Sequence, residues 1–477
     1  MIPSKIRSRL NISMLLITLT CTVMGCSKSS APTPAPTPAP TPTPVKTSTY
    51  TDPAAYGVPY SGVPATKDIV MYEVNIRSFS STSNFAGVAA RLDSIKALGV
   101  NTIWLMPIYP VGVLKSAGGL GSPYSVKDYN GVNTEFGSLT DLRNLIALAH
   151  TKGMAVIFDW VADHTSWDNA WIANKSWYQQ DASGNIISPV GTGWNDVAAL
   201  NYASTDMRTA MIRAMKFWVL TANIDGYRCD AADLVPADFW TQTIDTLNKF
   251  TSRKLIFLAE GTQTAQFSAG FQLDYAFSFY STLKGIFAGT QAPSALFTTD
   301  NTETGTLAAG GEKLRYITNH DVNSSDGPPI NVYKGKQGSL AAFVLASTMN
   351  GVPLIYNGQE VGTNKTMNIF NADPIDWSTN PDMTAEYKRI IAFRSGSNAL
   401  KSGALKTYNN TDIIAFEKTA TSDDVLVLVN ARNNPVTYTI PANLQNTAWT
   451  NSLTGTQVDL SATYNFSNYG YLILRKK

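Results

Sequence analysis

The stretch Ile224-Asp225-Gly226-Tyr227-Arg228-Cys229-Asp230-Ala231-Ala232 predicts a short apolar strand that ends in two charges. Residues i and i+2 of a strand point to the same side, so we expect Arg228 and Asp230 to project together. A guanidinium this close keeps a carboxylate ionised, and an ionised carboxylate at a strand end can act as a nucleophile. An isolated pair of this kind is more often a structural salt bridge. The rest of the chain decides between the two interpretations.

Short apolar runs alternate with amphipathic stretches from about residue 66 to residue 400. Continuous apolar strands separated by helices are typical of a parallel sheet covered on both faces. Eight repeats favour an α/β fold of the (β/α)₈ TIM-barrel type over an open parallel sheet. The expected strands are 69–74, 101–106, 154–159, the run around Arg228, 255–260, 271–274, 314–319 and 352–356, and the expected helices include 85–98, 139–151, 207–221 and 383–394.

Polar residues gather where these strands end, which is where a barrel of this type has its active site. They are Asp159, Arg228, Asp230, Glu260, Asn319, His320 and Asp321. The segment 165–205 after the third strand is long for a loop and rich in Trp, Asn, Asp and Gly, so we expect a functional insertion or a small subdomain. Residues 401–477 change to short strands with turns, which predicts a C-terminal antiparallel β-sandwich domain.

The N-terminus has the pattern of an export signal. Three basic residues precede an apolar run at 12–24 that is too short for a stable membrane anchor, so residues 1–25 are expected to be a signal peptide. The run ends Val23-Met24-Gly25-Cys26, which resembles a bacterial lipobox, and this implies cleavage before Cys26 and its lipidation. An ordinary signal peptide is the alternative. We expect a lipid-anchored protein, at the outer membrane of a Gram-negative bacterium, with the periplasmic or surface side left open.

Composition also bears on the linker, on disulfide bonds and on nucleic acid as a partner. Residues 26–65 are a linker rich in Pro, Thr and Ala, which is expected to be extended and cannot bury a core. Of three cysteines, Cys229 alone would remain as a free thiol after processing, so no disulfide is expected in the mature chain. The net charge of +2 argues against nucleic acid as a partner.

Three acidic residues, Asp230, Glu260 and Asp321, end three of the expected barrel strands. Hydrolysis of a glycosidic bond uses one carboxylate as nucleophile and one protonated carboxyl group as acid. Arg228 should lower the pKa of Asp230, whereas the apolar strand before Glu260 should raise the pKa of its carboxyl group. A raised pKa suits Glu260 to general acid catalysis.

Four motifs resemble those of the α-amylase family of glycoside hydrolases, and the resemblance runs from about Asp68 to the end. In the order of the family they are Asp159-Trp160-Val161-Ala162-Asp163-His164, Gly226-Tyr227-Arg228-Cys229-Asp230-Ala231, Leu258-Ala259-Glu260-Gly261 and Thr318-Asn319-His320-Asp321. One motif would be weak support, but four in order on the expected strands form a specific signal.

The resemblance implies a role for each motif residue. Asp230 would form a covalent glycosyl intermediate, Glu260 would act as acid and then base, and Asp321 would stabilise the distorted sugar of the transition state. The substrate-binding residues that it implies are Tyr124 as a stacking platform, Asp159, His164, Arg228 and His320.

Two departures from the family pattern concern metal and specificity. Asp163 stands where many relatives have an Asn that binds calcium, and its carboxylate is still a hard oxygen ligand. The mechanism requires no cofactor, so a calcium ion would be structural. The segment Ala231-Ala232-Asp233 lacks the Lys-His pair found in many α-amylases, which leaves the bond specificity open.

The expected function is retaining, endo-acting hydrolysis of α-1,4-glucosidic bonds in starch or maltooligosaccharides. A neopullulanase-like or cyclomaltodextrinase-like hydrolase, or an α-glucan transglycosylase, would use the same carboxylates and remains an alternative. A non-catalytic glycan-binding lipoprotein should have lost at least one of the three carboxylates, and all three are present. Trp167, Trp171, Trp177 and Trp194 are candidates to line a sugar cleft, and His150 is expected to be solvated or in the last turn of a helix.

Overall fold

A computed structural model describes residues 50–250 and 252–476. The chain divides into two compact units, residues 1–51 and 52–477, and the second is described here. The expected signal peptide, Cys26 and the linker as far as residue 49 lie outside the described residues. Within the described part, no helix combines the length and the apolar character needed to cross a membrane.

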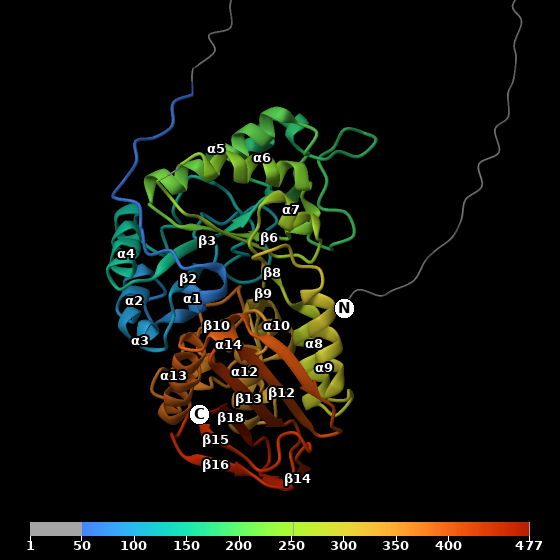
Figure 1. Cartoon of the computed structure of the whole chain (residues 1–477). Helices are drawn as coiled ribbons and strands as arrows, with labels where there is room; N and C mark the ends of the chain where they lie inside the picture. Colours follow the sequence, from blue (N-terminus) through green and yellow to red (C-terminus); the bar gives the residue numbers. More distant parts are fainter. Residues whose placement is uncertain (1–49, 251, 477) are drawn as a thin grey trace, which may run out of the picture. The chain divides into compact units, whose positions relative to one another are not determined.

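The larger part of the second unit is a closed barrel of eight parallel strands surrounded by helices (Figure 1). Its strands follow each other around the barrel in the order β1-β10-β9-β8-β7-β6-β3-β2. They are β1 (Met71–Val74), β2 (Thr102–Leu105), β3 (Ala155–Val161), β6 (Gly226–Asp230), β7 (Ile256–Ala259), β8 (Leu273–Tyr275), β9 (Glu312–Arg315) and β10 (Val352–Tyr356). The prediction of a (β/α)₈ barrel is confirmed.

Helices connect and cover these strands. The α-helices are α1 (Ile76–Phe79), α2 (Phe85–Ala89), α3 (Leu92–Ala97), α4 (Leu139–Thr151), α5 (Thr205–Thr221), α6 (Ala237–Asn248), α7 (Ala265–Ala269), α8 (Phe277–Phe287), α9 (Ser294–Thr304), α10 (His320–Asp326), α11 (Pro329–Val332), α12 (Lys336–Thr348), α13 (Pro381–Ser395) and α14 (Asn398–Ser402). Short 3₁₀ turns are η1 (Thr66–Asp68), η2 (Ala170–Ala173), η3 (Lys175–Trp177), η4 (Ala232–Leu234) and η5 (Gln359–Val361).

Two expected elements differ from the structure. The helix expected at 85–98 is divided into α2 and α3, because Arg91 leaves helical geometry (φ −113°, ψ 6°) and places its guanidinium 4.0 Å from the ring of Trp377. The strand expected at 314–319 ends at Arg315, and Asn319 instead caps α10 by accepting hydrogen bonds from the N–H groups of Asp321 and Val322. The fourth motif therefore lies beyond the strand, at the start of a helix.

The register of the barrel brings the site residues together. In the pairing of β3 with β6, Asp159 lies beside Arg228. β6 can enter this position because its first residue is Gly226, where an added Cβ would lie 1.9 Å from the carbonyl oxygen of Ile256. Strand β6 is also buried along its whole length. The charged end of the opening stretch is thus held inside a parallel sheet.

The insertion and the C-terminal region are both built from antiparallel strands. The insertion contains the pair β4 (His164–Ser166) and β5 (Val197–Ala199). The C-terminal domain has a six-stranded sheet and a two-stranded sheet. Its strands are β11 (Ala404–Tyr408), β12 (Ile413–Ala420), β13 (Asp423–Asn430), β14 (Val436–Thr439), β15 (Thr447–Asn451), β16 (Gln457–Leu460), β17 (Thr463–Phe466) and β18 (Tyr471–Lys476).

Alternating residues of β12 face two different cores. Ile414 and Phe416 belong to the hydrophobic cluster of the barrel helices, whereas Ile413 and Ala415 pack with Tyr438 of the smaller sheet. This alternation is the period of two that a strand imposes. One face of the sheet that contains β12 therefore packs against the barrel helices, and its other face packs against the smaller sheet.

Candidate active site

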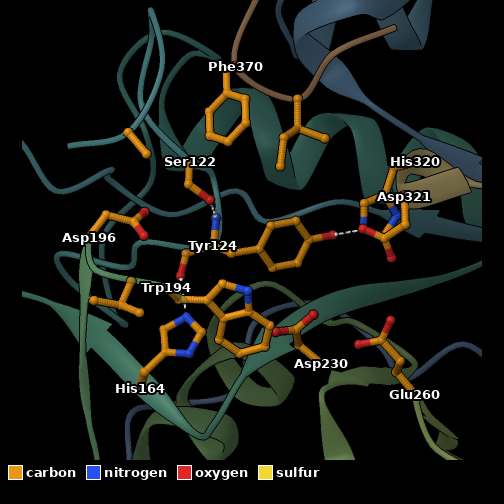
Figure 2. Close-up of a pocket in the computed structure, with 13 residues that line it drawn as sticks. Ser122, Tyr124, His164, Trp194, Asp196, Asp230, Glu260, His320, Asp321 and Phe370 are labelled. Carbon is orange, nitrogen blue, oxygen red and sulfur yellow. Dashed lines mark hydrogen bonds and ion pairs between the residues drawn. The ribbon is translucent and has the colours of Figure 1, made fainter. Parts of the chain in front are cut away.

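A pocket lies at the C-terminal ends of the barrel strands (Figure 2). It is lined by Ala117, Ser122, Tyr124, His164, Trp194, Asp196, Val197, Asp230, Glu260, His320, Asp321, Ile369 and Phe370. All three predicted catalytic carboxylates reach this pocket, together with three of the predicted substrate-binding residues. The other two, Asp159 and Arg228, are fully buried and contact the lining residues from below.

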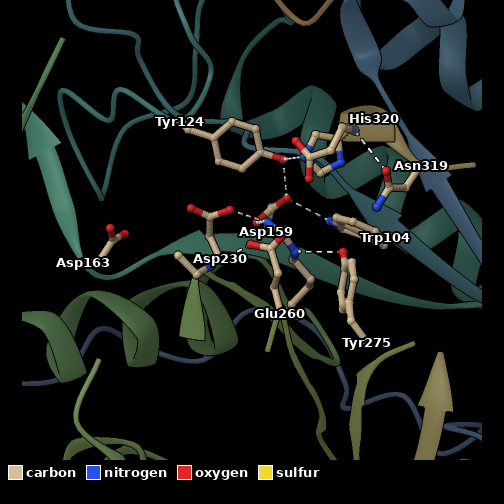
Figure 3. A network of polar contacts seen from close by, with 12 residues as sticks. Trp104, Tyr124, Asp159, Asp163, Asp230, Glu260, Tyr275, Asn319 and His320 are labelled. Atoms are coloured by element: carbon tan, nitrogen blue, oxygen red, sulfur yellow. Dashed lines mark hydrogen bonds and ion pairs between the residues drawn. The ribbon is translucent and has the colours of Figure 1, made fainter. Parts of the chain in front are cut away.

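Arg228 is the centre of a polar network, and Figure 3 labels its partners Asp159, Asp230, Glu260 and Tyr275. Its Nη1 lies 2.8 Å from Asp159 Oδ1 and 2.7 Å from Asp230 Oδ1, and its Nη2 lies 2.8 Å from Glu260 Oε1. Its Nε donates a hydrogen bond of 3.2 Å to the hydroxyl of Tyr275. A planar guanidinium can hold several acceptors in fixed directions, which a lysine cannot do. One arginine therefore fixes the positions of the Asp230 and Glu260 carboxyl groups relative to each other.

Burial dominates the ionisation of these two carboxyl groups. Arg228 opposes it, but the pKa of Asp230 is still raised, to about 6, so the expectation of a lowered pKa is wrong. Burial also raises the pKa of Glu260, to about 8; Arg228 opposes this rise, and the nearby charges of Asp230 and Asp321 add to it. The expected order is retained, because Glu260 holds its proton to a higher pH than Asp230. The sequence could not show that three carboxylates share one arginine.

A strained turn follows Asp230. Ala231 has left-handed backbone angles (φ 40°, ψ 42°), which cost free energy for a residue with a side chain. Its N–H donates a hydrogen bond of 2.7 Å to Glu260 Oε2, and the N–H of Ala232 donates to the Glu260 carbonyl at 2.9 Å. The turn thus ties the end of β6 to the residue that follows β7.

Tyr124 and His320 form a second part of the network. The Tyr124 hydroxyl donates to Asp159 Oδ2 at 3.0 Å and lies 2.7 Å from Nε2 of His320. Because the hydroxyl proton is used, Nε2 of His320 must be the donor in the second contact. Nδ1 of His320 lies 2.6 Å from Glu73 Oε1 and donates there, so both ring nitrogens carry protons.

The surroundings of His320 stabilise this imidazolium. Burial alone would lower its pKa, but Asp321 and Glu73 outweigh burial and raise the pKa to about 9. Glu73 was not predicted as a site residue. The signal in the sequence was a single glutamate inside the apolar run 69–74, and its partner lies 247 residues away.

His164 lies on the opposite wall with Trp194. Its Nδ1 is 2.8 Å from Asp163 Oδ2, and its Nε2 donates to the Tyr124 carbonyl at 3.1 Å. Burial opposes the charge, but Asp163 raises the pKa of His164. The Trp194 ring meets the imidazole edge to face at 5.6 Å. The other candidate tryptophans, Trp167, Trp171 and Trp177, do not line this pocket and pack partly buried against the core.

Asp163 is the residue expected from the sequence as a candidate calcium ligand. One of its carboxylate oxygens accepts from His164, and the other has no hydrogen-bond partner. The neighbouring pocket wall includes Pro189, Val190 and Leu234. Across residues 50–250 and 252–476 there is no group of three or more His, Cys, Asp and Glu side chains placed to hold a metal. Calcium takes about six to eight oxygen ligands, so Asp163 would need backbone carbonyls, amide oxygens or waters beside it to hold the ion.

The remaining histidine is away from the pocket. His150 lies in the last turn of α4, but it is not solvated as the first alternative expected. Its Nε2 is 2.7 Å from Asp225 Oδ2, and its ring stacks on Tyr60 at 4.5 Å. Asp225 precedes β6 and is buried, which draws the histidine inward.

A closed (β/α)₈ barrel with two carboxyl groups on one arginine at its C-terminal face has the parts of a glycoside hydrolase. The sequence matches the family description "Alpha amylase, catalytic domain" over residues 73–185 and 191–424. The chain therefore belongs to the α-amylase family.

The individual relatives share only about a quarter of their aligned residues with this chain. The chain is 25% identical to Alpha-amylase 2 of Dictyoglomus thermophilum over 76% of its own length and 66% of the relative's. It is 24% identical to Alpha-amylase MalA of Haloarcula japonica, over 82% of this chain and 59% of that protein. Among solved structures, an α-amylase from Lactobacillus plantarum has a TM-score of 0.78 at 26% identity, covering 86% of this chain and 99% of its own. The chain thus spans somewhat less than two thirds of both curated relatives.

Proposed function

We propose that this protein is a retaining, endo-acting hydrolase of α-1,4-glucosidic bonds in starch or maltooligosaccharides. The observation that carries the proposal is the pair Asp230 and Glu260, held on the guanidinium of Arg228 with pKa values raised to about 6 and about 8. Between these values Asp230 is ionised while Glu260 keeps its proton. Two carboxyl groups with separated pKa values provide a nucleophile and an acid.

The reaction has two steps. In the first, Asp230 attacks the anomeric carbon while Glu260 gives its proton to the glycosidic oxygen, so the leaving sugar departs as an alcohol and a glycosyl ester forms on Asp230. In the second, a water molecule attacks the same carbon, gives its proton to Glu260, and releases Asp230 as a carboxylate. Two inversions give net retention, and one water is consumed for each bond.

The other pocket residues bind and orient the sugar. The side chain of Asp321 is 55% exposed and lines the pocket, so it can accept hydrogen bonds from sugar hydroxyls although its Oδ1 lies 3.3 Å from His320 Nε2. His320 carries protons on both ring nitrogens and presents positive charge to the pocket, and the pKa of His164 is raised by Asp163. Tyr124 provides an aromatic face, and Asp159 and Arg228 hold the network below it. The chain supplies every group for this chemistry without a cofactor.

Product chromatography tests the proposal. The detergent-solubilised chain is incubated with soluble starch, pullulan and a cyclodextrin, beside Asp230→Asn and an exposed control, Asp238→Asn. Maltooligosaccharides should appear from starch with the unmodified chain and the control, and not with Asp230→Asn. Preferred cleavage of pullulan or cyclodextrin would support the neopullulanase-like or cyclomaltodextrinase-like alternative. Formation of transfer products would support the transglycosylase alternative. No product from any of the three would overturn the hydrolase.

We also propose that the protein is exported and held by lipid on Cys26 at the outer membrane. The support is the order of basic residues, apolar run and Val23-Met24-Gly25-Cys26, all outside the described residues. A Cys26→Ser variant should move activity from the membrane fraction to the soluble fraction. Retention of that variant in the membrane fraction would contradict anchoring through this cysteine.

A further inference from the structure

Two loops that are far apart in the sequence join beside the pocket. We call residues 116–122, after β2, and residues 367–371, after β10, the loop bridge. The N–H of Leu120 donates to the carbonyl of Phe370 at 2.9 Å. Arg77 holds the junction, because its Nη1 donates to the carbonyls of Gly121 (2.6 Å) and Ile369 (2.8 Å). Its Nη2 donates to the Leu120 carbonyl at 3.0 Å, and Arg77 is itself buried. The loop bridge is therefore a fixed part of the pocket.

The loop bridge gives the pocket an apolar wall. Ala117, Ile369 and Phe370 line the pocket, and none of them carries a polar side-chain atom. The Phe370 ring packs closely on Gly118, where an added Cβ would meet the ring at 2.5 Å. Only a glycine allows this contact, since Gly118 also has a positive φ of 68°. One side of the ring is thus supported, and the residue projects into the pocket.

Phe370 lies on the opposite side of the pocket from the acid. Figure 2 shows Phe370 and Glu260 on opposite sides of Tyr124. In the proposed reaction Glu260 protonates the leaving oxygen, so the leaving part of the substrate extends toward Glu260. The part that stays bound through Asp230 extends the other way, toward the loop bridge. A sugar ring has an apolar C–H face that an aromatic ring can cover.

We propose that Phe370 is the platform for the sugar next to the cleaved one on the donor side, held in place by Arg77 and Gly118. This inference rests on the proposed function for the direction of the substrate. Binding energy from a neighbouring sugar can be used to lower the barrier at the reacting centre, so removal of the platform should affect turnover of longer donors. Two substrates with the same leaving group can be compared: the α-maltoside carries this neighbouring sugar, and the α-glucoside lacks it.

The first test compares 4-nitrophenyl α-maltoside with 4-nitrophenyl α-glucoside. Phe370→Ala should lower kcat/KM for the maltoside roughly tenfold, which is the loss expected when a sugar no longer covers about half of one face of an aromatic ring. The same variant should leave kcat/KM for the glucoside nearly unchanged. The control is Tyr56→Ala, because this tyrosine is also an aromatic residue, is 38% exposed and lies outside the pocket lining. It should change neither substrate. An equal loss on both substrates, or no loss on the maltoside, would overturn the platform.

The second test displaces the ring without removing it. Gly118→Ala should reproduce the selective loss on the maltoside, because its Cβ must push the ring aside. Gly289→Ala is the control, since Gly289 has a similar φ of 77° but no atom within 4 Å of the added Cβ. Both variants bear the same backbone strain. A loss in the control as large as in Gly118→Ala would contradict the role of the ring.

Maltose binding by calorimetry separates this inference from the proposed function. Phe370→Ala and Gly118→Ala should weaken maltose binding about tenfold relative to the unmodified chain and the two controls. That result supports the platform even if neither nitrophenyl glycoside is cleaved, a case that would overturn only the hydrolase. Unchanged maltose affinity in both variants would overturn the platform while the hydrolase stands.

Discussion

Replacing Glu73 with glutamine should remove one of the two charges, those of Asp321 and Glu73, that keep His320 protonated. The pKa of His320 is raised from its usual 6.5 to about 9, because Asp321 and Glu73 outweigh the opposing effect of burial. At about 1.4 kcal/mol per pKa unit, this rise favours the imidazolium by about 3 kcal/mol. His320 is buried, so solvent screens this interaction little. Glu73 accepts from Nδ1 at 2.6 Å, whereas Asp321 is 3.3 Å from Nε2 and more than half exposed, so Glu73 should account for much of the effect.

The loss should appear in stability as well as in titration. A raised pKa means that the interaction stabilises the folded state fully below about pH 6.5 and is lost as the pH rises through about 9. Glu73→Gln should therefore be less stable by up to about 3 kcal/mol near pH 6, and the difference should narrow toward high pH. Urea unfolding across this range measures it, and activity at neutral pH should fall because Tyr124 loses its charged neighbour.

Labelled histidine gives a direct readout, since the chain has three histidines. In the unmodified chain one ring signal should titrate near pH 9, and in Glu73→Gln it should move toward neutral pH or below. Glu360→Gln is the control, because Glu360 is another buried carboxylate, bonded to the Tyr72 hydroxyl at 2.7 Å rather than to His320. A His320 signal that still titrates near pH 9 in Glu73→Gln would show that Glu73 does not hold the proton on His320.

Three further outcomes follow from the same contacts. The pH profile of kcat/KM should be a bell with limbs near 6 and 8, from Asp230 and Glu260, and a flat profile across that range would contradict their assignment. Burial lowers the pKa of Lys418 to about 8, so stability should rise with pH between about 8 and 10.5, and Lys418→Met should abolish that rise in urea unfolding. Asp225→Ala should cost about 2 kcal/mol of stability, because the Val156 N–H and His150 lose their acceptor, and an unchanged melting temperature would count against this.

The barrel could be predicted from the sequence because its signal is local. Uncharged, mostly apolar runs of four or five residues mark β2, β7 and β10 directly, and a charged residue at the end of a parallel strand must lie at one face of the barrel. The grouping of Asp230, Glu260 and Asp321 in one pocket follows from the same rule. The end of β9 was misplaced, because Tyr316 and Ile317 continue the apolar run after the strand has ended.

The rest of the site depends on contacts that no local pattern contains. Glu73 meets His320 across 247 residues, and Phe370 meets Gly118 across a similar distance in the chain. The pKa of Asp230 was predicted in the wrong direction, because the sequence shows Arg228 beside it but shows neither the depth of burial nor the nearby charges of Asp159 and Asp163. A neighbour in the sequence gives the direction of one effect on a pKa, whereas the pKa itself depends on burial and on every charge nearby in space.

Asp230 carries the sugar between the two steps of the proposed reaction, and this ester can be trapped. A fluorinated α-glucosyl fluoride, which forms the ester faster than water removes it, is incubated with the chain, and the peptides are analysed by mass spectrometry. We expect one added sugar on the peptide that contains Asp230, and none on the Asp230→Asn chain. A sugar on Glu260 or Asp321 instead, or release of fluoride with no labelled peptide, would rule out Asp230 as the nucleophile.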